Sequence, residues 1–260
     1  MIKLIVCDMD GTLLDDSGKL DESFFDVLNK LLELGIIFAV ASGRQYQQLY
    51  SNFENYANHV AYIAENGSFV IMDGNELYTS IIDKEDVRDI IEDINKLSHI
   101  NAVLCGKNAA YFNTRDKSFL EETKKYYYNY KIVEDLNKAN DDIFKISIYD
   151  LEGPENNSYK FLYPKWKDRL RLTISTPEWL DIYNYSASKG KAVKLLQQKF
   201  KIDEKETMVF GDYYNDVDMF DYAYYSYAME NSPDDVKEKA RFIAKSNLDN
   251  GVIEILKNLI

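Results

Sequence analysis

The sequence of 260 residues contains only two cysteines, Cys7 and Cys105. Two thiols cannot build the disulfide framework that stabilises small secreted domains, so we expect a protein of a reducing compartment. Positive charge is also scarce, because 31 Lys and Arg residues stand against 44 Asp and Glu residues and leave a net charge of -13. Nucleic acids and anionic membranes bind basic patches, so the sequence predicts neither as a partner.

Long apolar runs are missing as well. No stretch approaches the roughly 20 apolar residues of a membrane-spanning helix. The first apolar run is interrupted almost at once by Asp8 and Asp10, which argues against a secretory signal. We therefore expect a cytoplasmic protein. Its 46% of hydrophobic residues suffice for a sizeable core, and its length allows one large domain or two modest ones.

The first apolar segment, residues 4–7, leads directly into Asp8, Asp10 and the turn residues Gly11 and Thr12. A short apolar run bounded by a turn is typical of a strand buried on both faces. If the chain stays extended here, the side chains of Asp8 and Asp10 point the same way. Two carboxylates so close together repel each other, which either raises the pKa of one of them or calls for a cation between them. The segment therefore predicts a hard divalent metal with one carboxylate acting as nucleophile.

Alternating strand and helix patterns flank the middle of the chain. Apolar runs at 36–41, 60–64 and 207–210 read as buried strands, and helical spacing occurs over 24–32, 46–56 and 192–200. This alternation predicts an α/β fold with a doubly wound, Rossmann-like parallel sheet. The predicted domain is discontinuous and comprises residues 1–83 and 184–260.

Residues 84–183 have a different character and predict an inserted α+β domain. Alternating strands accompany two helical patterns, which favours one sheet with helices on one face. The segment 159–166 is ambiguous, because Pro164 argues against a long helix there.

Four polar clusters follow strands or begin helices of the α/β domain. In a parallel sheet the carboxyl ends of the strands share one edge, where ligands bind, so these clusters can converge. They provide carboxylates, one ammonium, a hydroxyl and an amide, but no histidine. Mg²⁺ fits this oxygen-rich set, whereas zinc prefers His and Cys. The clusters are Asp8 with Asp10, Ser42-Gly43-Arg44, Lys189, and Asp212 with Asn215 and Asp216.

The same set of side chains suits phosphoryl transfer, which needs a nucleophile, a metal and fixed hydrogen-bond donors. Asp8 would attack phosphorus, and Asp10 would protonate the leaving oxygen and then activate water. Ser42, Lys189 and backbone amides near Met9 would hold the phosphate. Asp212, Asp8 and the Asp10 carbonyl would hold Mg²⁺.

Some of these residues allow two interpretations. Asp216 is either a metal-site residue, acting through the water around the ion, or a helix cap. Ser42, followed by Gly43, contacts phosphate or caps the next helix, and we favour phosphate. Arg44 contacts substrate or forms a salt bridge. Asn215 orients either the phosphate or Lys189.

Asp8-Met9-Asp10-Gly11-Thr12 resembles the first motif of the haloacid dehalogenase-like (HAD) superfamily. Ser42, Lys189 and the segment 211–216 are similar to its second, third and fourth motifs, in the same order. The long insertion before Lys189, together with Ser42-Gly43-Arg44 and Glu65-Asn66-Gly67, resembles the Cof-type hydrolases of subfamily IIB. The resemblance implies that the insertion is a C2-type cap.

We therefore predict a Mg²⁺-dependent phosphatase of a small phosphorylated metabolite such as a sugar phosphate. The cap would select the substrate and exclude surplus water. One alternative is a phosphotransferase or phosphomutase on the same fold, and another is a non-catalytic sensor of a phosphorylated ligand. We expect a monomer or weak homo-oligomer.

Overall fold

The computed structural model describes residues 1–260 and divides into two compact units. The first comprises residues 1–77 and 188–260, and the second comprises residues 78–187. The boundaries predicted near Asp83 and Asn184 lie a few residues inside the second unit. None of the helices combines the length and the apolar character needed to cross a membrane.

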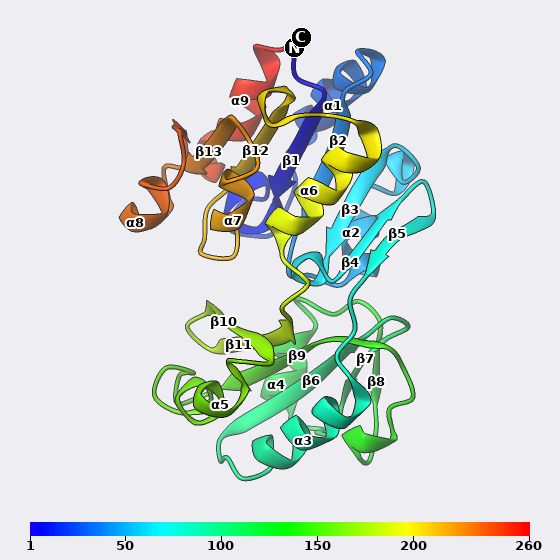
Figure 1. The fold of residues 1–260 in the computed structure, drawn as a ribbon, viewed down its shortest axis with the longest axis vertical. Coiled ribbons are helices and arrows are strands. Elements are labelled where there is room, and N and C mark those ends of the chain that lie inside the picture. Colours follow the sequence, from blue (N-terminus) through cyan, green and yellow to red (C-terminus); the bar gives the residue numbers. More distant parts are fainter. The chain divides into compact units, whose positions relative to one another are not determined.

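The first unit is built on an eight-stranded sheet (Figure 1). Its six parallel strands place β1 in the middle, between β12 and β2. Every residue of β1, β3 and β12 is buried, as expected for strands covered on both faces. The strands, in sheet order, are β14 (Phe242–Ala244), β13 (Tyr225–Met229), β12 (Thr207–Gly211), β1 (Leu4–Asp8), β2 (Ile37–Ala41), β3 (Val60–Ala64), β4 (Phe69–Met72) and β5 (Asn75–Thr79).

Helices cover both faces of this sheet (Figure 1). On one face α1 packs against α9, and the Phe24 ring of α1 lies 6.2 Å from the Phe53 ring that follows α2. On the other face α6 packs against α7. The doubly wound α/β fold predicted from the sequence is confirmed. The helices of this unit are α1 (Ser23–Glu33), α2 (Tyr46–Asn52), α6 (Lys189–Phe200), α7 (Val217–Phe220), α8 (Asp234–Lys237) and α9 (Gly251–Lys257).

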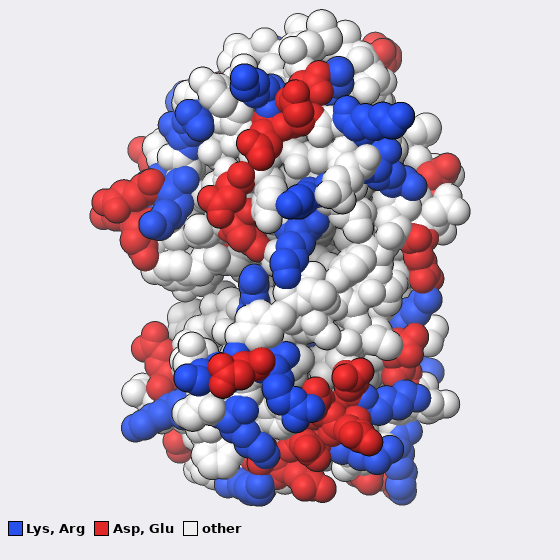
Figure 2. Space-filling view, in the orientation of Figure 1, with Lys and Arg blue, Asp and Glu red and all other residues white.

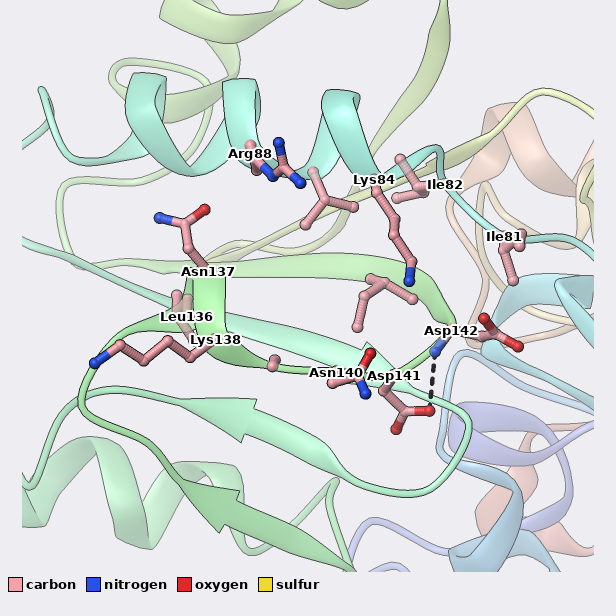
Figure 3. Close-up of a pocket in the computed structure, with 13 residues that line it drawn as sticks. Ile81, Ile82, Lys84, Arg88, Leu136, Asn137, Lys138, Asn140, Asp141 and Asp142 are labelled. Atoms are coloured by element: carbon pink, nitrogen blue, oxygen red, sulfur yellow. Dashed lines mark hydrogen bonds between the residues drawn. The ribbon is translucent and has the colours of Figure 1, made fainter.

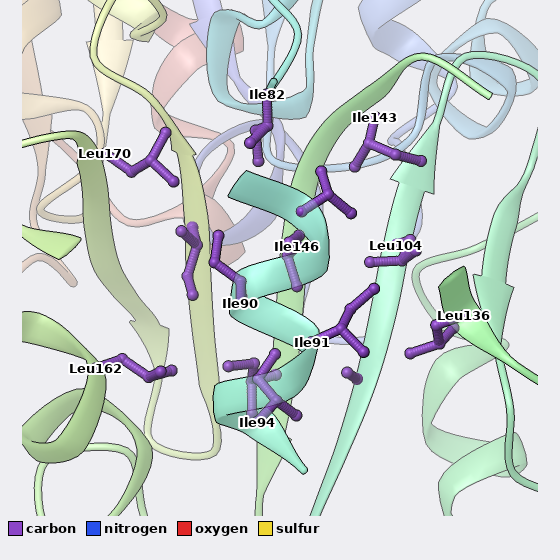
Figure 4. Packing of buried hydrophobic residues seen from close by; sticks show 14 of the residues in the cluster. Ile82, Ile90, Ile91, Ile94, Leu104, Leu136, Ile143, Ile146, Leu162 and Leu170 are labelled. Carbon is purple, nitrogen blue, oxygen red and sulfur yellow. The ribbon is translucent and has the colours of Figure 1, made fainter. Parts of the chain in front are cut away.

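The second unit contains one six-stranded sheet and three helices. The largest core cluster packs Ile90, Ile91 and Ile94 of α3 against Leu104 and Ile146 of the sheet (Figure 4). The strands, in sheet order, are β10 (Leu170–Thr176), β11 (Trp179–Asn184), β9 (Ile143–Asp150), β6 (Ile100–Gly106), β7 (Ala110–Phe112) and β8 (Tyr130–Ile132), and the helices are α3 (Lys84–Ile94), α4 (Lys117–Thr123) and α5 (Ser158–Trp166).

One local expectation for this unit is wrong, and one open point is settled. The sheet carries helices on both faces, because β6 is apolar on each side: Ala102 and Leu104 face the α3 cluster, whereas Val103 and Cys105 pack with Phe119 of α4. The segment around Pro164, which is ambiguous in the sequence, is a helix of nine residues. Proline is tolerated there because α5 is only nine residues long and Pro164 lies in its last turn, where one missing hydrogen bond costs little.

Candidate active site

The strand ends of the first unit bring the predicted polar segments to one edge. Strand β1 ends at Asp8, which pairs in register with Ala41, the residue before Ser42. Next to it, Cys7 pairs with Phe210, so β12 ends beside β1 and leads into Asp212. Lys189 is the first residue of α6, after the Ser188 hydroxyl caps that helix by accepting from the Lys191 amide. The fold thus places residues from both ends of the chain together.

Lys189 joins two buried carboxylates. Its Nζ donates to Asp8 Oδ1 at 2.5 Å and to Asp216 Oδ1 at 2.6 Å, and all three side chains are almost inaccessible to solvent. The other oxygen of Asp216, Oδ2, accepts from the backbone amides of Asp212 and Tyr213, at 3.0 and 3.1 Å. Asp216 makes no capping hydrogen bond to α7. It therefore fixes both the Lys189 ammonium and the loop that carries Asp212.

Burial and like charge set the protonation of this cluster. Burial raises the pKa of the Asp8 carboxyl well above its ordinary value, Asp216 raises it further, and Lys189 opposes both. Burial acts to lower the pKa of Lys189, but Asp216 and Asp8 outweigh it and raise that pKa, so the side chain stays an ammonium. Burial and then Asp216 raise the pKa of Asp212 to about 7. The cluster holds more negative charge than Lys189 neutralises.

The surplus charge suits a divalent cation. Carboxylate oxygens of Asp8, Asp212 and Asp216 lie within 4.8 Å of one another. Asp212 Oδ1 accepts only a 3.2 Å hydrogen bond from Thr12 Oγ1, which leaves its Oδ2 available to an ion. Hard oxygen ligands at this density match Mg²⁺, which keeps waters in its remaining positions. The residues present therefore fit the predicted metal.

Asp10 differs from Asp8 in burial and in partner. The strand ends at Asp8, and the turn Met9–Leu13 follows, with Gly11 at a φ of 73°. The Asp10 side chain is half exposed and accepts from Arg44, whose Nε lies 2.7 Å from Oδ2 and whose Nη2 donates to Oδ1. Of the two interpretations of Arg44, the structure contains the salt bridge. Asp8 and Asp10 both have extended backbone dihedrals, and a common direction of their side chains stays a prediction.

The remaining predicted residues lie around the same edge. Ser42 is buried, and its Oγ accepts from the Arg44 amide at 3.1 Å, which shapes the loop through Gly43. Met9 is fully buried, and its carbonyl accepts from the Leu14 amide at 2.8 Å. Asn215 Nδ2 donates to Asn66 Oδ1 at 3.2 Å. Contact of these residues with phosphate stays a prediction.

Three supporting residues escaped the sequence analysis as members of the site. Thr12 hydrogen-bonds Asp212, as described above, and Asn231 Nδ2 donates to the Gly11 carbonyl at 2.8 Å. Asp218 Oδ1 accepts from the Gly190 amide at 3.1 Å, beside Lys189. A signal existed for Asn231, because it follows β13 closely and is a polar residue at a strand's carboxyl end.

The second unit contains a pocket of about 210 Å³ that includes none of the predicted site residues. Lys84 and Arg88 of α3 lie on one side of it, and the segment 136–143 lies on the other (Figure 3). Asp141 is held at this segment by the Asn108 amide and the Tyr111 hydroxyl, at 2.8 and 3.0 Å.

A buried acidic cluster with one lysine, at the carboxyl edge of a parallel sheet, is the arrangement of an α/β enzyme that handles anionic groups. The family model for haloacid dehalogenase-like hydrolases matches residues 5–256. The chain is 31% identical over 261 residues to the 5-amino-6-(5-phospho-D-ribitylamino)uracil phosphatase YbjI of Escherichia coli K12, covering all of this chain and 96% of that protein. The chain belongs to the haloacid dehalogenase-like hydrolase family, and the prediction of a phosphatase of this family is confirmed.

Solved structures agree in fold. SMU.1108c from Streptococcus mutans UA159 superposes with a TM-score of 0.92 at 29% identity, covering 100% of this chain and 99% of that one. The HAD subclass IIB sugar phosphatase BT4131 superposes with a TM-score of 0.85 at 20% identity, covering 99% and 98% of the two chains. At that identity BT4131 supports the fold alone, and the fold is the one expected of subfamily IIB.

Proposed function

We propose that the protein is a Mg²⁺-dependent hydrolase of a small phosphorylated metabolite, acting through an aspartyl phosphate on Asp8. The observation that carries the proposal is the buried Asp8 carboxylate, which Lys189 holds at the end of β1 beside Asp212 and Asp216. A carboxylate fixed in this way has one oxygen engaged by Lys189 and a second oxygen left for attack on phosphorus.

The proposed reaction has two steps. An Asp8 oxygen forms a bond to phosphorus while the ester bond breaks, and Asp10 gives its proton to the leaving alcohol oxygen. Asp10, now a carboxylate, then takes a proton from a water molecule whose oxygen bonds phosphorus, and the bond from phosphorus to Asp8 breaks. The half-exposed Asp10 suits the exchange of protons with a substrate and with water.

The other residues bind and orient. Ser42, Gly43, Lys189, Asn215 and the Met9 amide would hold the phosphate oxygens. Asp8, Asp212 and the Asp10 carbonyl would hold Mg²⁺, which supplies neutralisation of phosphate charge when it is bound. Asp216 would act by holding Lys189 and the Asp212 loop, and Arg44 by holding Asp10 until the substrate arrives.

The substrate class is a free phosphorylated metabolite of sugar-phosphate type. The name of YbjI specifies a phosphorylated ribitylaminouracil, which carries its phosphate on a sugar-derived chain. We assign the inserted unit, residues 78–187, to the cap of the family. We further infer a cytoplasmic enzyme, monomeric or weakly oligomeric, whose buried free thiols, Cys7 and Cys105, suit a reducing compartment.

The first test is phosphate release from a panel of phosphomonoesters that includes 5-amino-6-(5-phospho-D-ribitylamino)uracil, with Mg²⁺ and after EDTA treatment. We expect turnover of at least one sugar-phosphate-like compound, its loss with EDTA and its return with Mg²⁺. If no compound of the panel released phosphate, the proposal would be refuted. Isomerised phosphosugar without free phosphate would instead indicate a phosphomutase.

The second test is Asp8→Asn, which keeps the size of the side chain and removes the nucleophile. We expect turnover to fall below detection while the fold is kept, because Asn cannot form the acyl phosphate. Asp26→Asn is the matched control, because Asp26 is an exposed aspartate of α1, and it should retain wild-type turnover. Unchanged activity of Asp8→Asn would remove Asp8 as the nucleophile.

A further inference from the structure

The turn after β3 has an unusual backbone. Three consecutive residues are left-handed: Glu65 at a φ of 49°, Asn66 at 55° and Gly67 at 88°. Glycine adopts this region freely and Asn tolerates it, but a Glu there is uncommon and costs free energy. Such a backbone persists only where its surroundings hold it, and it is concentrated at functional sites.

This turn contacts the segments that supply the other site residues. The Glu65 amide donates to the Arg44 carbonyl at 3.1 Å, and the Asn66 amide donates to the Ser42 carbonyl at 3.0 Å. The Asn66 side chain, which is buried, accepts from Asn215 Nδ2 at 3.2 Å. Gly67 lies so close to the Ser188 carbonyl, next to Lys189, that a Cβ atom would overlap it. One turn therefore touches the loops of Ser42, Lys189 and Asn215.

We propose that Asn66 is a positioning residue of the active site, which holds the Asn215 amide and the 42–44 loop in the geometry that binds phosphate. The inference rests on the proposed function, because Asn215 is assigned there to the phosphate. The left-handed backbone turns the Asn66 amide toward Ser42 and its side chain toward Asn215. Asn66 itself acts through Asn215 and does not need to touch the substrate.

Another left-handed non-glycine residue, outside this turn, provides a comparison. Asp73 has a φ of 52° in the turn between β4 and β5, but it is exposed at the tip of a hairpin. Its carbonyl accepts from the Asn75 side chain within the same turn, at 2.9 Å. A local turn thus needs no distant partner, whereas Asn66 binds a residue 149 positions away.

The experiment replaces the side chain and keeps the backbone. Asn66→Gly retains a residue at ease with a φ of 55° and removes the amide that holds Asn215. With p-nitrophenyl phosphate and Mg²⁺ as the probe, we expect kcat/KM to fall about tenfold, as for loss of one hydrogen bond to an anion. Thermal unfolding should occur at the wild-type temperature or above. The matched control Asp73→Gly should leave kcat and KM unchanged.

A double-mutant cycle separates positioning from a general structural role. If Asn66 acts through Asn215, the Asn66→Gly/Asn215→Ala double variant should be no slower than Asn215→Ala alone. Wild-type kinetics in Asn66→Gly, or independent effects that multiply in the double variant, would overturn the proposal.

A crystal structure of Asn66→Gly provides a readout that does not depend on activity. We expect the Asn215 side chain to leave its wild-type position, whereas the 42–44 loop stays, because Asn66→Gly keeps the backbone amide that donates to the Ser42 carbonyl. If Asn215 keeps its wild-type position, the proposal is wrong, whatever the kinetics. A wild-type enzyme without phosphatase activity would refute the proposed function alone, because the structural comparison still decides whether Asn66 positions Asn215.

Discussion

Gly11 shows how closely single residues approach each other in this site. It has a φ of 73°, and a Cβ atom built on it would overlap the Asp212 carboxylate. The turn after β1 can therefore lie beside Asp212, a proposed metal ligand, only because position 11 has no side chain. The Asn231 side chain fixes the same turn through the Gly11 carbonyl.

We predict that Gly11→Ala reduces kcat/KM by about a hundredfold, because a shift of about 1 Å in a catalytic group has effects of this size. Gly35→Ala is a well-matched control: Gly35 also has a φ of 73°, but nothing lies within 4 Å of its added Cβ. Both variants should lose about 1 kcal/mol of unfolding free energy from backbone strain, measured by urea denaturation. Equal activity of the two variants would contradict the role given to Gly11.

Single residues of the candidate site could be predicted where they lie at a strand end or a helix start that the sequence pattern indicates. Asp8 ends one buried strand and Asp212 follows another, so local pattern predicts that both lie at the sheet edge, whereas Lys189 was assigned from its place after the insertion and at the start of a helix. Their partners could not be predicted in this way. The pairing of Asp10 with Arg44, and of Asp216 with Lys189, depends on where turns end and which of several nearby acids each cation meets.

At the scale of elements, one aspartate joins two helices of the second unit. Asp93 of α3 is buried, and its Oδ2 accepts from Lys165 Nζ at 2.5 Å and from Trp166 Nε1 at 3.1 Å, both in α5. Its Oδ1 accepts from Lys96 Nζ at 2.7 Å. The contact ties the end of α3 to the end of α5 over the apolar cluster that both helices cover.

We predict that Asp93→Ala lowers the unfolding free energy by about 2–3 kcal/mol, because it leaves the buried Trp166 Nε1 without an acceptor and removes the carboxylate that pairs with Lys165 and Lys96. Asp89→Ala is the control, because Asp89 is exposed on the same helix, and its unfolding free energy should change by less than about 0.5 kcal/mol. Urea denaturation of the three proteins at neutral pH measures the difference.

The same contact predicts a pH dependence. Burial acts to raise the pKa of Asp93, but hydrogen bonds from Lys165, Lys96 and Trp166 outweigh it and hold that pKa below its ordinary value. A lowered folded pKa contributes stability above the unfolded pKa of about 3.9, and this contribution is lost as pH falls through the folded pKa. The difference between wild type and Asp93→Ala should therefore shrink as the pH falls below about 4. A constant difference would contradict the ionic origin.

Helices and strands could be predicted where a continuous hydrophobic pattern marks them. The buried strands β1, β2, β3 and β12 appear in the sequence as apolar runs, because both faces of a central parallel strand are covered. The second unit was harder. Its sheet has helices on both faces and a proline-containing helix, and neither follows from local propensity, because the packing of α4 and α5 decides both.

Charge acts at the scale of the whole molecule. On the face drawn in Figure 2, positive side chains lie among the negative ones, yet the net charge is -13. Such an excess destabilises the folded state through self-repulsion, which salt screens. A non-denaturing salt such as NaCl should therefore stabilise the protein, and we expect Mg²⁺ to add a stabilisation of its own by binding at the acidic cluster.

We predict that Mg²⁺ raises the melting temperature more than NaCl at equal ionic strength, because only Mg²⁺ relieves the repulsion among Asp8, Asp212 and Asp216. A difference of about 2–4 °C corresponds to about 1 kcal/mol for a protein of this size. Asp212→Asn should abolish the excess due to Mg²⁺ and keep the response to NaCl. Equal shifts with the two salts would argue against a metal site in the acidic cluster.

The insertion also determines when the active site can form during synthesis. Thr12 and Asp212 hydrogen-bond across 200 positions of the chain, and β1 pairs with β12. At about 5–20 residues per second, the ribosome needs roughly 10–40 s to add the intervening chain. During that interval β1 has β2 on one side and an open edge on the other. Nascent chains therefore carry an unpaired apolar strand that chaperones can bind, and they remain inactive until the last third of the protein emerges.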